Sequence, residues 1–557
     1  LGDPMKCARV FAETLKLCGA KKIFGVVGGH IYPIIHEANK IGIEYVGTRS
    51  EMCAGFMAEG WALSTGNFGI CIGTAGPGFT NYLTSVANSE RGCIPVLYIG
   101  GKAKTSELDR NELQDFNQID MVKPIVKFAR CILDAERTAE YVLRAITSCV
   151  SGKPGPAYVE IPKDILESEV KSFTKPKTIF VRNRAMGNFE DLKAAAELIN
   201  SAKRPVLIVG SGAWWSRTQD ELQKFVEKTG IPLFTRNASR GIISDSHPLC
   251  LGVAASRSPI FQYAINNADL AIVLGTRPGF TMSYSSFPPH LPVVRVDIDP
   301  AEITNLMNVD VGVQGDIREV LRQLLPMVEK REFSQWVNEL RAVQAKTAER
   351  VFEEVLRSQK TGAIHPAMVC MLLRQKVDKN TVVVVDGGDA ALWGNLLLPA
   401  MGPGQFLSIA GTSFGPLGVG VPYAIAAKLA HPEKEVILVT GDGALGYGIM
   451  EISTAIRLGI KITVVVLNDC HWGMIARGVL KDGIVSNFRE AMGTEVGEVK
   501  YDEIFKAMGG DGISVKEPSE ISNALDIAEK SKKPTCVNVF VDPEAYFPDF
   551  TAGGSFE

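Results

Sequence analysis

A strand–turn–helix–strand pattern between residues 436 and 469 constrains the fold of this 557-residue chain more than any other feature. The apolar run at 436–439 predicts a buried strand. The turn Gly441-Asp442-Gly443 follows it, then a helical pattern, and then a second apolar run at 462–467. Two strands joined through a helix in this way lie parallel, and their loops open at the carboxyl ends of the strands. The pattern therefore predicts an α/β domain whose functional loops share one edge of a sheet.

The loops at that predicted edge have the chemistry of a phosphate and metal site. Glycines at a helix start let backbone N–H groups approach a phosphate, where the helix dipole favours negative charge. Asp442 and Asp469 each follow one of the two strands, so both are expected to face the same crevice. Carboxylate oxygens beside bound phosphates suit Mg²⁺. Gly-Asp-Gly is also common in ordinary turns, so the tripeptide alone does not separate a turn from a site.

The longer pattern resembles the fingerprint of the thiamine diphosphate (ThDP) enzymes, and the resemblance covers nearly the whole chain. In that family Gly-Asp-Gly is followed by an amphipathic helix and by a strand that ends in Asn-Asn. Here the second Asn, the side-chain metal ligand, is Asp469. Asp still provides a hard oxygen ligand, so we expect the site to be retained. The resemblance implies that Mg²⁺ is bound by Asp442, by Asp469 and by the backbone carbonyl of His471.

Composition sets broad limits on function. The chain is 46% hydrophobic and 22% charged, as is usual for globular proteins, and its length predicts several domains. A formal net charge of −3 gives no electrostatic reason to expect nucleic acid or an anionic membrane as a partner. No apolar run reaches transmembrane length. The 11 cysteines are scattered without CxxC pairs, which predicts reduced, mostly buried thiols in a cytoplasmic protein.

Alternating helix and strand patterns predict three α/β domains, each a doubly wound parallel sheet covered by helices. A loose segment rich in Lys, Arg and Pro, about 171–187, is expected to be a linker. With the resemblance, the domains are a pyrimidine-binding domain at 5–172, a central Rossmann-like domain at 188–330, a diphosphate-binding domain at 363–545 and a C-terminal tail at 546–557.

The first domain carries a candidate catalytic carboxylate, Glu51, after the strand pattern at 43–46. Taken alone, a Glu at the start of a helix is usually a partner of the helix dipole. The resemblance implies another role, because acetolactate synthases, benzaldehyde lyase and the 2-hydroxyacyl-CoA lyases carry such a Glu in an Arg-x-Glu segment. That Glu hydrogen-bonds N1′ of the cofactor's aminopyrimidine, which prepares N4′ to remove the proton from the thiazolium C2. Here the segment is Arg49-Ser50-Glu51.

The resemblance implies further cofactor contacts along the chain. They lie in the loop beside the pyrimidine, in the acidic turn after the strand at 382–385, in the segment that supports the bent cofactor, and around the two strand ends described above. An acidic surface turn explains the pattern at 386–389 equally well. The implied contacts are Glu51, Pro77, Asn81, Gly388, Asp389, Gly415, Leu417, Gly441, Asp442, Gly443, Ala444, Asp469, His471, Trp472, Gly473 and Met474.

Two further residues bear on the subfamily. The segment Gly28-Gly29-His30-Ile31 resembles the Gly-Ala-His-Ile of benzaldehyde lyase, whose His transfers protons at the substrate. A lone His is more often structural, so the role of His30 depends on the resemblance. Gln114 matches a Gln that benzaldehyde lyase and acetolactate synthase place near the reacting carbon. The implied catalytic residues are therefore Glu51, His30 and Gln114. The Trp472 side chain fits a position beside the substrate and, equally, a position in the hydrophobic core.

The match to acetolactate synthase is weaker at two specificity positions. Its Phe-Asp-Asp-Arg is absent after the Gly-x-Arg turn at 275–277, and Gly478 stands where that enzyme has a Trp. The first departure also argues against bound FAD. The segment at 240–248 is similar to 2-hydroxyacyl-CoA lyases and oxalyl-CoA decarboxylase. Binding of CoA, or of a nucleotide such as ADP, by the middle domain therefore remains an alternative.

These matches predict a ThDP- and Mg²⁺-dependent lyase and carboligase that acts on 2-hydroxy ketones and aldehydes, similar to benzaldehyde lyase. The alternatives are an enzyme similar to 2-hydroxyacyl-CoA lyase or oxalyl-CoA decarboxylase, and a transferase that condenses 2-keto acids as acetolactate synthase does. A binding protein without activity is disfavoured, because it would not need Glu51. The resemblance also implies small carbonyl substrates and a homodimer or homotetramer with active sites between subunits.

Overall fold

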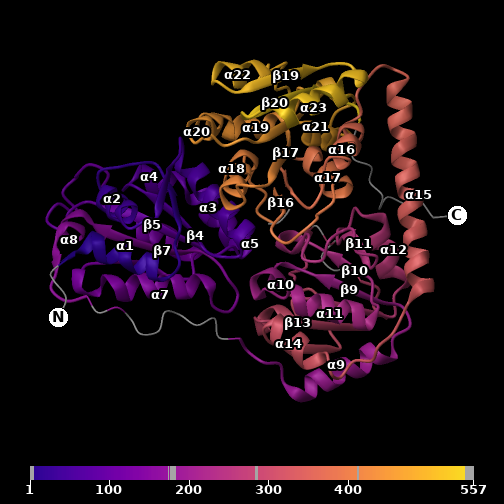
Figure 1. The fold of residues 1–557 in the computed structure, drawn as a ribbon, viewed down its shortest axis with the longest axis horizontal. Helices are drawn as coiled ribbons and strands as arrows, with labels where there is room; N and C mark the ends of the chain where they lie inside the picture. Colours follow the sequence, from indigo (N-terminus) through magenta and orange to yellow (C-terminus); the bar gives the residue numbers. More distant parts are fainter. Residues whose placement is uncertain are drawn as a thin grey trace. The chain divides into compact units, whose positions relative to one another are not determined.

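A computed structural model describes residues 5–173, 175, 184–280, 282, 287–409 and 413–545. Within these residues the chain forms three parallel six-stranded sheets flanked by helices, and one two-stranded pair (Figure 1). The three sheets confirm the predicted α/β class. The chain separates into two compact units, one of Leu1–Asn183 with Phe414–Ala430 and one of Arg184–Ser413 with His431–Glu557. The predicted tail at 546–557 lies outside the described residues, and the domain boundaries stay predictions.

The first sheet has the strand order β3-β2-β4-β5-β7-β6, and an apolar core packs between it and its helices. The strand predicted at 22–27 is β2 and ends at Gly25. The strands are β2 (Lys22–Gly25), β3 (Glu44–Gly47), β4 (Gly69–Gly73), β5 (Val96–Lys102), β6 (Ala129–Cys131) and β7 (Ala157–Pro162). The helices include α1 (Cys7–Leu17), α2 (Tyr32–Lys40), α3 (Glu51–Thr65), α4 (Pro77–Asn81), α5 (Leu83–Gly92), α6 (Gln118–Val122), α7 (Thr138–Val150) and α8 (Lys163–Glu167).

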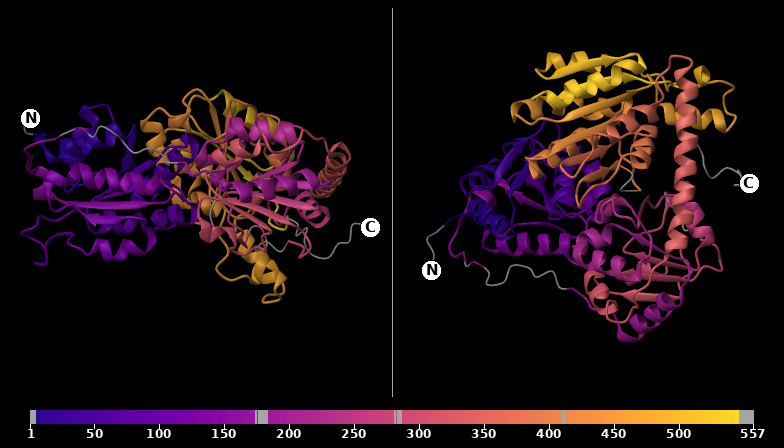
Figure 2. Two further views of the ribbon diagram at one scale, coloured as in Figure 1. Left: turned by 90° about the horizontal axis from the view of Figure 1, so that it is seen from below. Right: turned by 45° about the vertical axis from the view of Figure 1, so that its right-hand side comes forward.

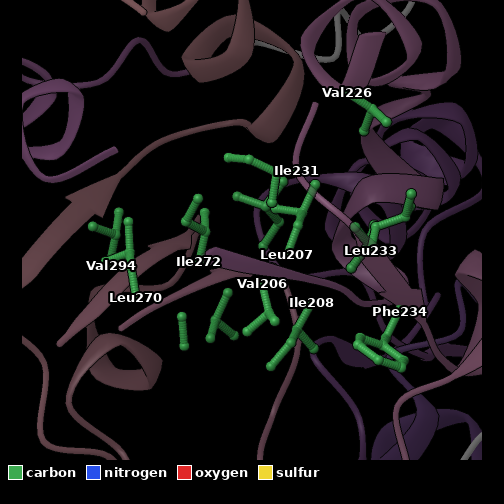
Figure 3. Close-up of a cluster of buried hydrophobic side chains, with 14 of the residues drawn as sticks. Val206, Leu207, Ile208, Val226, Ile231, Leu233, Phe234, Leu270, Ile272 and Val294 are labelled. Atoms are coloured by element: carbon green, nitrogen blue, oxygen red, sulfur yellow. The ribbon is translucent and has the colours of Figure 1, made fainter. Parts of the chain in front are cut away.

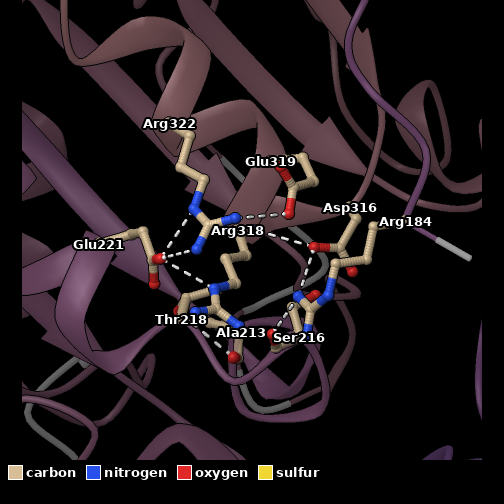
Figure 4. Close-up of polar contacts among 9 residues, drawn as sticks. All are labelled: Arg184, Ala213, Ser216, Thr218, Glu221, Asp316, Arg318, Glu319 and Arg322. Atoms are coloured by element: carbon tan, nitrogen blue, oxygen red, sulfur yellow. Dashed lines mark hydrogen bonds and ion pairs between the residues drawn. The ribbon is translucent and has the colours of Figure 1, made fainter. Parts of the chain in front are cut away.

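The middle sheet has the order β11-β10-β9-β12-β13-β14, and Figure 3 shows part of its hydrophobic core. Glu221 of α11 accepts hydrogen bonds from Arg318 and Arg322 of α14 at 2.8 and 2.9 Å (Figure 4). The strands are β9 (Pro205–Val209), β10 (Leu233–Thr235), β11 (Cys250–Val253), β12 (Leu270–Leu274), β13 (Val293–Asp297) and β14 (Val311–Gln314). The helices are α9 (Phe189–Ser201), α10 (Ser211–Ser216), α11 (Gln219–Thr229), α12 (Pro259–Asn267), α13 (Pro300–Ile303) and α14 (Ile317–Leu324). The long helix α15 (Ser334–Gln359) leads on to the third sheet (Figure 2).

The third sheet has the order β16-β15-β17-β18-β20-β19 and contains the predicted strand–helix–strand unit as parallel neighbours β17 and β18. The predicted helical segment between them is three consecutive short helices, α19, η6 and α20, and α19 ends at Gly448, a residue type that weakens a helix. The strands are β15 (Thr381–Val385), β16 (Phe406–Ser408), β17 (Glu435–Gly441), β18 (Thr463–Asn468), β19 (Asp511–Val515) and β20 (Thr535–Phe540). The helices are α16 (Pro366–Arg374), α17 (Asp389–Leu397), α19 (Asp442–Gly448), η6 (Ile449–Glu451), α20 (Ile452–Arg457), α21 (Gly473–Lys481), α22 (Tyr501–Ala507) and α23 (Ile521–Lys530).

Helix α18 (Gly420–Ala430) comes from the sequence of the third domain but packs on α3 in the first unit. A Cβ atom at Gly60 would lie 3.0 Å from the Cβ of Ala426, so glycine permits this close approach. The fully buried Glu59 carboxylate connects the two helices and α5. It accepts hydrogen bonds from Tyr423 at 2.8 Å, from Ser89 at 2.8 Å and from Asn88 at 2.7 Å. Burial raises the pKa of Glu59 to about 8, although the three donors oppose that shift.

The raised pKa of Glu59 predicts a pH-dependent cost to folding. Between about pH 4.5 and 8 the unfolded chain loses a proton that the folded protein keeps, so stability decreases as pH rises through this window. The free energy of unfolding of wild type relative to Glu59→Gln should therefore fall by about 1.4 kcal/mol per pH unit there. Urea midpoints measured from pH 5 to 8.5 test this. The exposed Glu44→Gln is the control, and a wild-type-to-variant difference that does not change with pH would contradict the assignment.

Candidate active site

Three neighbouring strands of the third sheet are each followed directly by an acidic residue. Asp386 follows β15, Asp442 follows β17 and Asp469 follows β18. The strands pair directly, with Val385 opposite Val439 and Gly441 opposite Leu467. Because the carboxyl ends of parallel strands meet at one edge, the register brings these three residues to the same loop crevice.

Asp442 is nearly fully buried, and its Oδ2 has no hydrogen-bond partner among the residues that the structure describes. Burial, and next the carboxylate of Asp469, raise the pKa of Asp442 to about 7. Burial also raises the pKa of Asp469, although Arg477 acts in the opposite direction. A buried carboxylate oxygen without a partner is a costly arrangement that a cation would relieve.

The donor set around Asp442 fits Mg²⁺ better than a metal held by protein side chains alone. The described part of the chain contains no group of three or more His, Cys, Asp and Glu side chains placed to hold a metal ion. Mg²⁺ usually takes one or two carboxylates and completes its shell with phosphate oxygens and water. Cys470 has a φ of +61°, so the loop turns sharply after Asp469, and the Asp469 Oδ1 accepts a hydrogen bond from His471 N–H at 3.1 Å.

Glycines around the crevice occupy positions with no room for a side chain. A Cβ atom would lie 3.1 Å from the Gly441 nitrogen if added at Gly387, and 2.9 Å from the Met474 side chain if added at Gly388. At Gly443 it would lie 2.5 Å from the ring of Trp472. Glycine therefore lets the segments after β15 and β17 pack closely against each other and against the segment after β18, and backbone N–H groups at such helix starts are the groups that bind a diphosphate. Trp472 is partly exposed rather than plain core.

Arg477 belongs to the same crevice, and no motif in the sequence predicted it. Its Nε donates to Asp389 at 2.8 Å, its Nη2 lies 3.4 Å from Asp469, and its Nη1 donates to the Pro543 carbonyl at 2.6 Å. Asp389 is therefore part of a mostly buried ion pair, not an acidic surface turn. The only signal in the sequence is a basic residue two turns after the last strand end, which is common on helix surfaces.

In the first unit, Glu51 is the first residue of α3 and is almost fully buried. Its Oε2 accepts a hydrogen bond from the Asn81 side chain at 3.0 Å. The first turn of α4 approaches the same carboxylate, since a Cβ atom at Gly78 would lie 3.4 Å from Glu51 Oε1. Pro77 starts α4 and Asn81 ends it. The structure thus brings together the predicted pyrimidine-side residues Glu51, Pro77 and Asn81.

His30 and Gln114 meet through a third residue, Thr74. The His30 Nδ1 lies 3.0 Å from Thr74 Oγ1, and that hydroxyl donates to Gln114 Oε1 at 3.4 Å. Gln114 has a φ of +64°, a conformation that costs energy for a residue with a side chain and that clusters at functional sites. Burial, and next the charge of Lys163, lower the pKa of His30 from 6.5, so the imidazole is neutral at pH 7.

A buried amide, Gln118, also shapes this region and was not predicted. Its Oε1 accepts a hydrogen bond from the Gly76 N–H at 2.9 Å, and its Nε2 donates to Glu160 at 2.8 Å.

Gly415 and Leu417, the predicted supports of the bent cofactor, lie before α18. Gly415 is exposed and Leu417 is partly buried. They and Glu51 belong to the first unit, whereas Asp442, Asp469 and Trp472 belong to the second.

The sequence matches three family models for thiamine pyrophosphate (ThDP) enzymes, in the order of the three sheets. They are the N-terminal TPP binding domain at residues 5–121, the central domain at 192–324 and the C-terminal TPP binding domain at 386–539. The chain belongs to the thiamine pyrophosphate enzymes. The buried Asp442 oxygen and the glycine-lined crevice fit the diphosphate end of that cofactor.

Relatives narrow the class to ThDP-dependent lyases and transferases of the acetolactate synthase and 2-hydroxyacyl-CoA lyase group. The acetolactate synthase large subunit IlvG of Mycobacterium tuberculosis is 30% identical over 550 residues, 98% of this chain and 97% of that protein. The 2-hydroxyacyl-CoA lyase 1 of Mus musculus is 30% identical over 560 residues, 97% of this chain and 94% of that protein. The 2-hydroxyacyl-CoA lyase 2 of Homo sapiens is 31% identical over 509 residues, 84% of this chain and 79% of that protein.

Removing the Asp442 carboxylate should weaken cofactor binding. We expect Asp442→Ala to raise the Kd for ThDP at saturating MgCl₂ by more than about tenfold, since outer contacts of metal sites alone account for 10- to 100-fold. Calorimetric titration of ThDP into the apoprotein measures this. Asp469→Asn, which keeps an oxygen ligand, is the matched control and should retain binding. Wild-type affinity in Asp442→Ala would show that the metal site lies elsewhere.

Glu51→Gln should separate binding from activation. Gln fills the same space and can still hydrogen-bond, so we expect ThDP affinity to be retained. Turnover should fall by roughly 10²–10⁴-fold, the range for losing general acid–base help. Hydrogen–deuterium exchange at C2 of bound ThDP, followed by NMR, should slow in parallel. Wild-type exchange in this variant would assign the activating carboxylate to another residue.

Proposed function

We propose that this protein is a ThDP- and Mg²⁺-dependent lyase and carboligase of 2-hydroxy ketones and aldehydes, similar to benzaldehyde lyase. The observation that carries the proposal is the contact of His30 Nδ1 with Thr74 Oγ1 at 3.0 Å. Because this contact engages Nδ1, Nε2 is the nitrogen that can exchange a proton with a substrate. The lowered pKa of His30 keeps the ring neutral and therefore basic at pH 7.

The proposed cofactor contacts divide into two groups. Asp442, Asp469 and the His471 carbonyl would hold Mg²⁺, while Gly388, Asp389, Gly441, Gly443, Ala444, Gly473 and Met474 would surround the diphosphate. Pro77, Asn81, Gly415, Leu417 and Trp472 would surround the thiamine rings. When bound, ThDP supplies a carbon nucleophile for addition to a carbonyl group. Glu51 would hold the proton at N1′ of the aminopyrimidine, and Asn81 fixes the direction of its carboxylate.

His30 would handle the proton of the substrate hydroxyl. In cleavage, Nε2 accepts the O–H proton as the adjacent C–C bond breaks, an aldehyde leaves, and the bonding electron pair stays with the donor fragment. In ligation the same proton returns to the new alkoxide. Gln114, held through Thr74, would orient the carbonyl and hydroxyl oxygens by hydrogen bonding. Small-molecule carbonyl compounds are the substrates in this proposal.

Cleavage of 2-hydroxyacyl-CoA is the second candidate, and it breaks the equivalent bond beside a hydroxyl group. Two relatives that carry this name support it. The middle sheet adds an observation at the carboxyl ends of β9 and β12. A Cβ atom at Gly210 would lie 2.3 Å from Thr276, whose buried Oγ1 has no hydrogen-bond partner among the described residues. The carboxyl ends of parallel strands are where α/β sheets bind nucleotides, so these strand ends are the place where the nucleotide part of CoA or ADP would bind.

The proposal includes a homodimer or homotetramer in a cytoplasmic location. The family resemblance completes each active site with residues from two subunits. The eleven cysteines, all within the described ranges, are free thiols and nine are buried, as expected in a reducing compartment. No helix of the described residues has the length and apolar content needed to cross a membrane.

His30→Ala should slow cleavage of an acyloin such as benzoin by roughly 10²–10⁴-fold without changing ThDP affinity. The wild-type rate should fall as pH decreases through the pKa of His30, because protonation removes the base, and the variant should lack this limb. His36→Ala, an exposed histidine on α2, is the control.

A substrate panel decides between the candidate functions. Wild type is incubated with benzoin, with pyruvate and with a 2-hydroxyacyl-CoA, and consumption is followed by chromatography. We expect cleavage of the acyloin, and preference for the acyl-CoA would favour the second candidate. Efficient condensation of pyruvate with no acyloin cleavage, or normal acyloin cleavage by His30→Ala, would overturn the proposal.

A further inference from the structure

We propose that Arg477 is a positioning residue of the cofactor site, whose guanidinium fixes Asp389 and Asp469 and offsets their negative charge so that an anionic diphosphate can bind. The inference rests on the assignment of the Asp442–Asp469 crevice to the diphosphate of ThDP. It concerns a residue on α21 that the family fingerprint described above does not include.

One side chain connects three segments that are far apart in the sequence. Arg477 contacts Asp389 at the start of α17 through both Nε and Nη2. Its Nη2 also faces Asp469 in the loop after β18, at 3.4 Å. Its Nη1 donates to the Pro543 carbonyl beyond β20 at 2.6 Å. Arg477 thus cross-links the ends of β15, β18 and β20, which a flexible lysine ammonium could not do with the same geometry.

The ion pairs are largely buried. The side chains of Arg477 and Asp389 are 14% exposed, and that of Asp469 is 13% exposed. Exposed ion pairs contribute little because water screens them, whereas loss of one partner from a buried pair leaves an uncompensated charge. Arg477 is therefore positioned to influence the charge of the crevice.

The crevice needs such compensation because it holds several carboxylates and must accept an anion. Asp386, Asp389, Asp442 and Asp469 all lie at the ends of β15, β17 and β18. Position 469 is Asn in the related fingerprint, so Asp469 adds a negative charge. The two oxygens of Asp469 divide their roles, since Oδ1 accepts from His471 N–H and Oδ2 faces Arg477. The added charge and the guanidinium thus lie side by side.

Gly473 supplies independent geometric support. A Cβ atom there would lie 2.0 Å from Asp469 Oδ2 and 2.3 Å from Arg477 Nη2. Any larger residue would push these two groups apart. Glycine at 473 thus leaves room for the Asp469–Arg477 contact in addition to any approach of the backbone to a phosphate.

The test is calorimetric titration of ThDP into full-length apoprotein at saturating MgCl₂. Arg477→Met removes the charge but keeps much of the side-chain volume, and we expect it to raise the Kd for ThDP by about 10- to 100-fold. Neutralising the two partners in the same protein, as Arg477→Met/Asp389→Asn/Asp469→Asn, should recover most of the affinity. Arg477→Lys should give an intermediate value, because it keeps the charge without the planar geometry. Exposed Arg489→Met is the control for the general loss of a positive charge.

The outcomes separate the charge role from a merely structural one. Unchanged ThDP affinity in Arg477→Met overturns the proposal. The proposal is also overturned if Arg477→Met weakens ThDP affinity, the two Asn substitutions fail to restore it, and the apoprotein of each variant melts at the wild-type temperature. If Arg477→Met does not fold, Arg477→Gln, which keeps hydrogen-bond donors but not charge, takes its place in the same series. Wild-type binding by Asp442→Ala would instead refute the placement of the diphosphate itself, and with it the proposed function.

Discussion

The parallel register of β15, β17 and β18 is the constraint on which the cofactor site depends. Pairing Val385 with Val439, and Gly441 with Leu467, fixes where each strand ends and therefore where Asp386, Asp442 and Asp469 lie. A shift of one residue would turn each of these side chains to the other face of the sheet. The buried valine and leucine runs that set this register thus serve stability and chemistry together, because the same burial desolvates Asp442.

Local patterns predicted the fold well because they depend on neighbours in sequence. Apolar runs bounded by glycine identified β17 and β18, and their parallel pairing follows from the intervening helical segment. The helical segment between them was predicted, but not its division into three consecutive short helices, the first of which ends at Gly448. The placement of α18 on α3 could not be predicted, since Glu59 and Tyr423 are 364 residues apart and only the folded chain brings them into contact.

The candidate site was predictable to the extent that it consists of motifs. Glu51, Asp442 and Asp469 stand at helix starts and strand ends, where sequence patterns place functional residues. The residues that hold them were not visible in this way. Thr74 contacts His30 from 44 residues away, and Arg477 contacts Asp389 from 88 residues away. Threonine and arginine at such positions look like ordinary surface residues until the fold sets their partners.

Each reactive group in the two units is thus positioned by a partner from another segment: Asn81 for Glu51, Thr74 for His30 and Arg477 for Asp469. These partners have different consequences for specificity. In the proposed function, the partners of Glu51 and Asp469 would act on the cofactor and would therefore serve every reaction that the cofactor supports. In the proposed function, the His30–Thr74–Gln114 group would instead orient a neutral base, and it would therefore favour substrates that carry a hydroxyl beside the bond to be broken. In both candidate functions the cleavage step would use that base, so the choice between acyloins and 2-hydroxyacyl-CoA would depend on groups that recognise the rest of the substrate. Under the second candidate function, a CoA nucleotide would bind at the carboxyl ends of β9 and β12, around Gly210 and Thr276, and would provide that recognition there.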